Sequence, residues 1–303
     1  FLTGHNGLVG SAILKTLREK GYKKIITVSK KKLNLLDQKK VFNFIKKKKP
    51  KIIINAAGKV GGIHANEKYQ AQFIYENLTI QNNIIHGAYI TGVKNILFLG
   101  SSCIYPKFAK QPIKENYLLE GKLEKTNEAY SLAKIAGIKM CESYNFQYQT
   151  NYKCLMPTNL YGPNDNYHKD NSHFFPALIK KLHKMKQEDK SELILWGNGK
   201  AKREVIFVDD LANACVYFMN KKTKDTLINI GTGKDYTIKY FAELIAKLIL
   251  PHKEIFIKYD GLKPNGPPRK VLDISLAKKY GWNIKSDLKK SILKTYKSFL
   301  LNI

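Results

Sequence analysis

The sequence predicts an α/β fold, in which a doubly wound parallel sheet is followed by a smaller α/β domain. Short apolar runs alternate with helical patterns up to about residue 163, which is typical of a parallel sheet covered by helices. A glycine-rich turn joins the first predicted strand to the first predicted helix. Beyond about residue 164 the alternation breaks, and a second domain with its own topology is expected there.

The first strand, at residues 1–3, runs into a G-x-x-G-x-x-G turn that opens a helix. Glycines at this spacing permit a tight turn, a close approach of the backbone to a pyrophosphate, and close helix–strand packing. The motif is weak by itself, because ordinary strand–helix turns also use glycine. The helix that follows and a second predicted strand at 24–28 favour a Rossmann-type dinucleotide site. Its expected contacts are Gly4, Asn6, Gly7, Leu8, Val9 and Gly10.

The end of the second predicted strand indicates which dinucleotide binds. An NAD site usually has an acid there for the ribose hydroxyls, whereas this chain has Ser29 followed by Lys30, Lys31 and Lys32. A hydroxyl and cations suit a 2′-phosphate, so we predict NADP(H), with Lys30 as a contact. The alternative is a solvated lysine run, which is common in this chain.

Two further segments complete the predicted cofactor side. Residues 52–54 form a predicted strand, and Ala56 and Ala57 are small enough to let the chain pass close to a dinucleotide. Asp37 is interpreted as a helix N-cap or an adenine-side residue. Long helices are predicted at about 67–91 and 130–148, packing on one side of the sheet.

The central stretch lies around an apolar run, 96–100, that is typical of a buried strand. Ser101 and Cys103 follow its carboxyl end, where open α/β sheets bind ligands. Tyr130 and Lys134 are four residues apart and share one helix face. A Ser, a Tyr and a Lys brought together can catalyse hydride transfer, with the Ser holding a carbonyl oxygen. We expect the Lys ammonium to lower the Tyr pKa.

The C-terminal part is predicted as a helix at 174–186, strands at 193–196 and 204–208, and a helix capped by Asp209 and Asp210. A strand at 227–231 is expected to rejoin the main sheet. The predicted domains are therefore 1–163, which binds NADP and is rejoined by segments at about 205–235, and 164–303, which mainly binds substrate.

The composition limits the partners. The formal net charge is +29, but the basic residues are nearly all lysines spread along the chain. Since lysine is poorer than arginine at bidentate phosphate and base contacts, we predict neither a nucleic-acid nor a membrane partner. The four cysteines are widely spaced, which indicates neither a metal site nor a disulfide framework and fits a cytoplasmic setting.

Tyr-x-x-x-Lys after a strand-end Ser resembles the short-chain dehydrogenase/reductase superfamily. The strings at 100–107, 127–130, 133–137 and 156–163 resemble more narrowly the GDP-L-fucose synthase family, and this resemblance runs nearly end to end. It implies NADPH-dependent 3,5-epimerisation and 4-reduction of a GDP-sugar substrate, GDP-4-keto-6-deoxy-D-mannose, to GDP-L-fucose. It also implies a homodimer formed through the two long helices.

The resemblance carries roles onto matching residues. It implies that Cys103 and His173 are the base and acid of epimerisation, and that Ser101, Tyr130 and Lys134 serve the reduction. Further implied cofactor contacts are Pro157, Asn159, Leu160 and His173. The implied substrate contacts are Asn159, Lys181, Trp196, Arg203 and Lys270. Where the family can show an arginine this chain has Lys181, and where it can show a cation in the glycine turn this chain has Asn6.

Two alternatives are open. Another nucleotide-sugar enzyme, a 4-epimerase or a 4,6-dehydratase, shares the fold. Such dehydratases usually place Asp-Glu where this chain has Ser102 and Cys103, and a simple 4-epimerase does not need a Cys–His pair. The other alternative is a basic, non-catalytic binding protein on the same scaffold. It predicts degraded catalytic positions, yet all five expected catalytic residues are present.

Overall fold

The computed structural model describes residues 1–168, 172–262 and 266–302. Its centre is a five-stranded sheet in the order β1-β2-β3-β4-β9, with every neighbouring pair parallel. These strands are β1 (Leu2–Thr3), β2 (Ile52–Asn55), β3 (Asn95–Leu99), β4 (Asn151–Pro157) and β9 (Leu227–Ile230). The predicted parallel α/β sheet is confirmed, and β9 returns to it after the excursion that follows β4.

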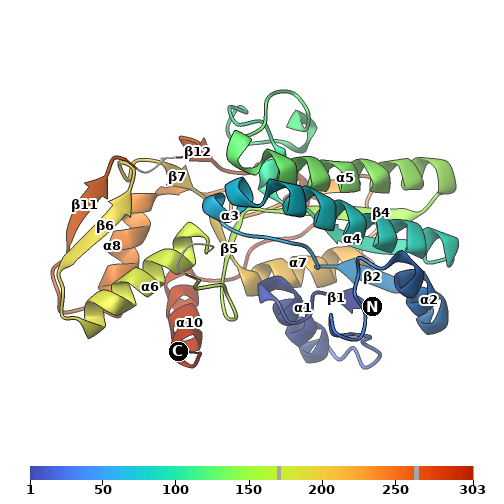
Figure 1. The fold of residues 1–303 in the computed structure, drawn as a ribbon, viewed down its shortest axis with the longest axis horizontal. Coiled ribbons are helices and arrows are strands. Elements are labelled where there is room, and N and C mark those ends of the chain that lie inside the picture. Colours follow the sequence, from blue (N-terminus) through green and yellow to red (C-terminus); the bar gives the residue numbers. More distant parts are fainter. Residues whose placement is uncertain (169–171, 263–265, 303) are drawn as a thin grey trace.

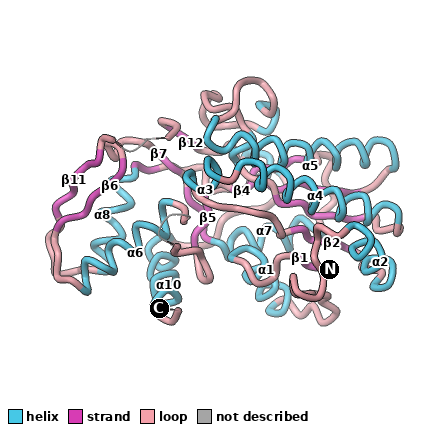
Figure 2. The backbone as a smooth tube through the Cα atoms, in the orientation of Figure 1, coloured by secondary structure: helices cyan, strands magenta, loops and turns pink. Residues whose placement is uncertain are grey.

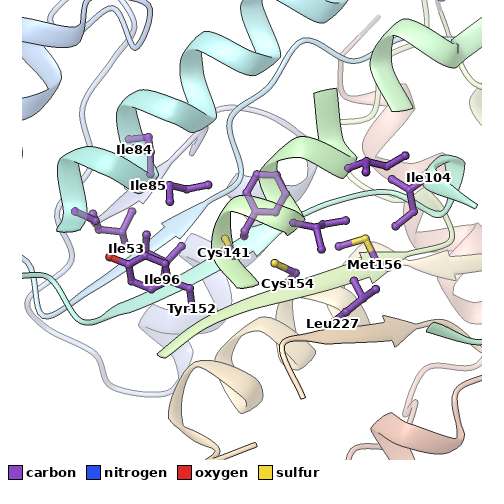
Figure 3. Packing of buried hydrophobic residues seen from close by; sticks show 14 of the residues in the cluster. Ile53, Ile84, Ile85, Ile96, Ile104, Cys141, Tyr152, Cys154, Met156 and Leu227 are labelled. Atoms are coloured by element: carbon purple, nitrogen blue, oxygen red, sulfur yellow. The ribbon is translucent and has the colours of Figure 1, made fainter. Parts of the chain in front are cut away.

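Helices cover both faces of this sheet (Figure 1). One face carries α2 (Gln38–Lys48), α4 (Gln70–Ile90) and α5 (Glu128–Tyr148), and the other carries α1 (Leu8–Glu19) and α7 (Val208–Asn220). Figure 3 shows Ile53, Ile96 and Tyr152 of the sheet packing against Ile84 and Ile85 of α4. The two long helices therefore lie on one side of the sheet, as predicted.

Two predicted elements differ in the structure. Residues 24–28 are not a regular strand, although the Leu2 amide donates to the Ile26 carbonyl at 2.9 Å. The reason is that β1 spans only two residues and cannot support a longer ladder. The helix predicted at 67–91 is broken at Tyr69, where φ is −117° and ψ is 36°, so that a short α3 (Ile63–Lys68) precedes α4.

The C-terminal part gathers at one end of the molecule (Figure 2). Helices α6 (Phe174–Gln187), α8 (Ile238–Ile249) and α10 (Leu288–Leu300) enclose a core of their own. Three small sheets accompany them, with the orders β5-β8, β6-β11 and β10-β7-β12. Their strands are β5 (Asn159–Tyr161), β6 (Glu192–Trp196), β7 (Lys202–Arg203), β8 (Val205–Phe207), β10 (Tyr236–Thr237), β11 (Phe256–Asp260) and β12 (Arg269–Lys270).

The segment at 205–235 is divided between the two parts. Strand β8 pairs with β5 rather than with the main sheet, whereas α7 and β9 belong to the layers of the main sheet. Asp209 and Asp210 lie in the first turn of α7 and do not cap it, because its N-cap is Phe207. The short α9 (Ser275–Lys279) packs its Ala277 into the core on the α7 side. The division at residue 163 stays a prediction.

The topology determines where a ligand can bind. After β1 the chain runs through α1 to the segment at 24–28, which lies beside β1 at one edge of the sheet. It then runs through α2 to β2, which lies on the opposite side of β1. Open α/β sheets bind ligands at such a reversal, outside the carboxyl ends of the strands. No helix in the described ranges is both long and apolar enough to cross a bilayer.

Candidate active site

A cleft of about 1160 Å³ lies at the carboxyl ends of the main strands, against the C-terminal part. Apart from Asp37, every residue that the sequence analysis assigned to a site lines this one cleft. These residues are Gly4, Asn6, Gly7, Leu8, Val9, Gly10, Lys30, Ala56, Ala57, Ser101, Cys103, Tyr130, Lys134, Pro157, Asn159, Leu160, His173, Lys181, Trp196, Arg203 and Lys270.

The backbone of the glycine turn packs so closely that two of its glycines have no room for a side chain. Gly4 has a φ of +67°, and a Cβ there would lie 2.7 Å from the Ala56 carbonyl oxygen. A Cβ on Gly10 would lie 2.0 Å from the Gly4 carbonyl oxygen. Gly7 is the N-cap of α1, without a side-chain cap or an acid in the first turn. The turn therefore presents open backbone amides at the positive end of a helix dipole, which fits a pyrophosphate.

The end of β2 is held against this turn. The Thr3 hydroxyl donates to Asn55 Oδ1 at 2.8 Å and accepts from the Ala57 amide at 3.1 Å. Of the three neighbouring lysines at 30–32, only Lys30 lines the cleft. Asp37 accepts from the Lys40 amide at 3.0 Å and caps α2, which confirms its N-cap interpretation.

Some residues that line the cleft were missed by the sequence reasoning. Leu33, Asn34, Leu35 and Leu36 line it directly after the lysines, and the three leucines beside a cation were the available signal. Ser131, which is buried and does not line the cleft, was missed as a positioning residue. Its hydroxyl donates to the Cys103 carbonyl at 2.9 Å, so α5 holds the loop that carries the thiol.

Ser101 and Cys103 follow β3 as expected. Ser101 is the N-cap of a short 3-10 turn at Ser102–Ile104, and its Oγ accepts from the Cys103 amide at 3.3 Å. The same hydroxyl acts on the phenol of Tyr130, whose pKa it lowers as a hydrogen-bonding neighbour. One serine thus connects the strand end, the thiol-bearing turn and the α5 tyrosine.

The expectation that Lys134 lowers the pKa of Tyr130 is wrong for this structure. Burial raises the pKa of Tyr130, the nearby Cys103 raises it further, and the hydrogen bond with Ser101 opposes them. The Lys134 ammonium donates to the Leu99 carbonyl at 3.0 Å and lies 5.9 Å from the centre of the Tyr130 ring. Because the two residues share a helix face, the Lys134 ammonium lies near the ring of Tyr130. Burial also lowers the pKa of Lys134 itself to about 8.

The raised pKa suits one role of the phenol. Tyr130 stays protonated at neutral pH and is available as a proton donor. An alkoxide is a stronger base than a phenolate, so the transfer of this proton to an alkoxide is favourable.

Cys103 and His173 share one cationic neighbour. The Lys270 ammonium donates to Cys103 Sγ at 3.4 Å. Burial raises the pKa of the Cys103 thiol, but Lys270, Ser101 and Arg203 outweigh it and leave that pKa lowered. His173 is the N-cap residue of α6 and is open to the water of the cleft, although protein surrounds the rest of its ring. This burial and Lys270 lower the pKa of His173.

The expected nucleotide contacts lie on the C-terminal elements. Arg203 donates through Nη1 to the Pro267 carbonyl at 2.6 Å. Lys181 donates to the Ile194 carbonyl at 2.9 Å, and its ammonium lies 5.9 Å from the Trp196 ring. Trp196 is 51% exposed, so it is not a packed core ring and is available to stack on a base.

Glu204 is a positioning residue that the sequence reasoning missed. It is fully buried, and its carboxylate accepts from the Gly233 amide at 2.7 Å and the Leu272 amide at 2.8 Å. Its carbonyl accepts from Asn159 Nδ2 at 2.8 Å. Glu204 therefore ties β7 to the end of β9 and to the segment after β12. Its only sequence signal was its place next to Arg203.

The fold and the cleft can now be compared with known proteins. Residues 1–231 match the NAD dependent epimerase/dehydratase family. The chain belongs to this family. It is therefore an enzyme, and the alternative of a basic non-catalytic protein is not supported.

Three relatives illustrate the range of this family. GDP-L-fucose synthase 1 of Arabidopsis thaliana is 47% identical, over 100% of this chain and 93% of that protein. GDP-L-colitose synthase of Yersinia pseudotuberculosis is 43% identical, over 99% and 97%. The structure of a GDP-mannoheptose C4 reductase from Campylobacter jejuni with NADP bound is similar with a TM-score of 0.88 and 34% identity, covering 99% of this chain and 97% of that one.

Proposed function

We propose that this enzyme uses NADPH to convert GDP-4-keto-6-deoxy-D-mannose to GDP-L-fucose, by epimerisation at carbons 3 and 5 and reduction at carbon 4. The observation that carries the proposal is the shared cleft. It holds a thiol and a histidine for epimerisation next to a Ser–Tyr–Lys set for reduction, and a cation contacts the thiol. The identity to GDP-L-fucose synthases over the whole chain supports the same conclusion.

The epimerisation uses the ketone at carbon 4, which acidifies the protons at carbons 3 and 5. The Cys103 thiolate removes each proton in turn, and His173 returns a proton to the opposite face of the carbon. Ser101 and Tyr130 donate hydrogen bonds to the enolate oxygen that forms meanwhile. Because these donors are already in place, they stabilise the developing charge at little reorganisation cost.

The reduction uses the same oxygen site. NADPH, when bound, supplies the hydride for carbon 4. The glycine turn would hold its pyrophosphate and Lys30 its 2′-phosphate. Tyr130 gives its proton to the alkoxide oxygen, and Ser101 keeps that oxygen oriented. One pair of hydroxyl groups thereby serves both reactions.

The nucleotide half of the substrate would bind on the C-terminal side. Arg203 and Lys270 would hold the diphosphate, Asn159 the junction of sugar and phosphate, and Trp196 the guanine. Lys181 supplies a point charge rather than the bidentate fork of an arginine. The high net charge of the chain would also attract an anionic sugar nucleotide to the cleft.

Assembly and location are part of the proposal. The outer faces of α4 and α5 expose Tyr75, which is 65% accessible, and Leu132, which is 44% accessible. Burying this apolar surface against a second copy would form a four-helix homodimer interface. The free cysteines fit a reducing compartment, and we propose the cytoplasm.

The first test is turnover. Purified enzyme should oxidise NADPH with GDP-4-keto-6-deoxy-D-mannose and yield GDP-L-fucose by NMR. Cys103→Ser and His173→Gln should each slow epimerisation about 100-fold or more, as expected for a lost general acid or base, and Cys103→Ser should leave NADPH affinity within about twofold of wild type. His168→Gln is the matched control. Unchanged epimerisation in Cys103→Ser would remove the thiol from the mechanism, and a different sugar product would reassign the substrate.

The second test concerns the cofactor. Lys30→Glu should weaken NADPH binding by about tenfold and leave NADH binding nearly unchanged, since one charged contact to the 2′-phosphate contributes on the order of 1.4 kcal/mol. Lys31→Glu is a control of equal charge, because Lys31 does not line the cleft. If both substitutions weaken NADPH binding equally, Lys30 acts only through the electrostatic field of the whole chain and not through a direct contact.

A further inference from the structure

Lys270 lies between the Cys103 thiol and the proposed binding site of the diphosphate. Its ammonium contacts the Cys103 thiol at 3.4 Å. The register of β12 with β7 also sets Lys270 opposite Arg203, the other cation proposed for the diphosphate. Arg203 is bound through Nη1 to the carbonyls of Lys202 and Pro267, at 2.8 and 2.6 Å. The arginine is thus tied to the backbone, whereas the lysine extends to the thiol.

The same ammonium acts on both members of the proposed acid–base pair. Cys103 faces Lys270 from β12, Arg203 from β7, Ser101 from its own turn and Tyr130 from α5. His173 lines the same cleft as Lys270 and Cys103, and burial and the charge of Lys270 both lower the pKa of His173. A nearby cation favours the thiolate and disfavours the imidazolium.

These two effects oppose each other in catalysis. Proton abstraction needs the thiolate, and proton return needs the imidazolium. Lys270 in the free enzyme promotes the first form and suppresses the second. The phosphates of a bound sugar diphosphate would offset its charge. Both pKa values would then rise. The imidazole then takes up a proton, and the fraction of the thiol that stays ionised is smaller but more strongly basic.

We propose that Lys270 couples the binding of the substrate's diphosphate to the protonation of Cys103 and His173, so that the imidazole gains the proton it must return once the sugar nucleotide is in the cleft. This inference rests on the proposed function, because it takes a GDP-sugar as the ligand. It makes Lys270 a positioning residue for protons as well as a phosphate contact.

GDP-mannose is the probe for this coupling. It carries a diphosphate diester without a group that titrates near neutral pH, and it lacks the ketone, so it binds without turnover. Calorimetric titration of the NADP-loaded enzyme at pH 7, in two cationic buffers with different heats of ionisation, gives the protons taken up per ligand bound. Wild-type enzyme should take up protons, and Lys270→Gln should lose at least half of this uptake.

Two variants separate coupling from affinity. Lys270→Arg keeps the cation and should keep most of the uptake. Lys181→Gln should weaken GDP-mannose binding but leave the uptake per bound ligand unchanged, because Lys181 contacts the Ile194 carbonyl and Trp196 rather than the acid–base pair. Circular dichroism confirms that each variant is folded.

A second readout follows the residues directly. Nitrogen-15 NMR of labelled histidine, with the signal assigned through His173→Gln, should show that GDP-mannose raises the pKa of His173 in wild-type enzyme. In Lys270→Gln that pKa should already be raised without ligand. Thiolate absorbance, measured relative to Cys103→Ser, should show that GDP-mannose also raises the pKa of the Cys103 thiol in wild-type enzyme. In Lys270→Gln the pKa of the thiol should already be raised without ligand.

The outcomes are distinguishable. Equal proton uptake in wild type and Lys270→Gln, or no uptake in wild type, overturns the coupling. If the ketosugar is turned over but binding takes up no protons, the coupling alone fails. If GDP-mannose does not bind and the ketosugar is not turned over, the proposed function fails and the coupling fails with it.

Discussion

Asp165 shows how much the surroundings of a single side chain decide. Its Oδ1 accepts from the Asn166 amide at 2.7 Å, whereas its Oδ2 is covered and has no hydrogen-bond partner in the described part of the chain. The residue as a whole is partly accessible, yet burial of the carboxylate raises its pKa to about 7. Asp165 lines the cleft, so a charge that changes near pH 7 faces the ligand side.

The substitution Asp165→Asn tests this assignment. The pKa of the Asp165 carboxyl is higher in the folded protein than the unfolded value of about 3.9. The stability that its protonated form gives to the fold is therefore fully present below about pH 4 and is lost as the pH rises through 7. The Asn amide does not ionise, so the variant does not lose stability in this way. We therefore expect the stability of Asp165→Asn relative to wild type to increase by about 1–2 kcal/mol from pH 5 to pH 8, after allowance for partial exposure.

Denaturant unfolding at the two pH values measures this difference. Asp189→Asn is the control, because Asp189 is exposed and hydrogen-bonded to Lys253, which lowers the pKa of its carboxyl. A stability difference for Asp165→Asn that is the same at both pH values would contradict the assignment.

At the scale of elements, the glycine turn couples the packing of α1 to cofactor binding. Gly10 lies within the first turns of α1 and abuts the Gly4 carbonyl. Gly7 faces more open space, because a Cβ there would lie 3.5 Å from its nearest neighbour, the Gly4 carbonyl oxygen. The two glycines therefore have separable roles. Gly10 lets the helix approach the strand, and Gly7 leaves the helix N-terminus open.

Paired alanine substitutions should separate these roles. Gly10→Ala should destabilise the fold by about 2 kcal/mol, because overpacking costs about 1–3 kcal/mol, and it should also weaken NADPH binding. Gly7→Ala should change stability by less than about 1 kcal/mol, since its Cβ meets only ordinary contacts, yet weaken NADPH about tenfold or more. Denaturant unfolding and fluorescence titration measure both quantities. Wild-type stability in Gly10→Ala would contradict the close approach.

At the scale of the whole molecule, the exposed apolar face of α4 and α5 should decide the oligomeric state. The double substitution Tyr75→Glu and Leu132→Glu should convert a dimer of 34.7 kDa chains into monomers, because it buries like charges at the proposed interface. Sedimentation equilibrium measures the mass. Leu301→Glu is the control, since Leu301 is 78% exposed after α10. A wild-type monomer, or a double variant that stays dimeric, would contradict this interface.

The sequence by itself determined the fold class, the glycine turn and the α5 face that carries Tyr130 and Lys134. These features depend on local spacing, because strands, helices and tight turns follow periods of a few residues. The position of Cys103 past β3 follows from the same reasoning. The catalytic and binding roles of these residues stay predictions that the experiments above address.

The tertiary structure decided what depends on distant neighbours. The contact of Lys270 with Cys103 joins residues 167 positions apart. The segment predicted as a strand at 24–28 is not regular, because the two-residue β1 contacts it through the Leu2–Ile26 hydrogen bond and cannot support a longer ladder. No local sequence pattern measures burial. Burial raised the pKa of Tyr130, which was expected to be lowered. Folding also buried Glu204, whose carboxylate accepts from backbone amides. Charge and hydrogen-bond energies depend on such surroundings, and those form only when the chain has folded.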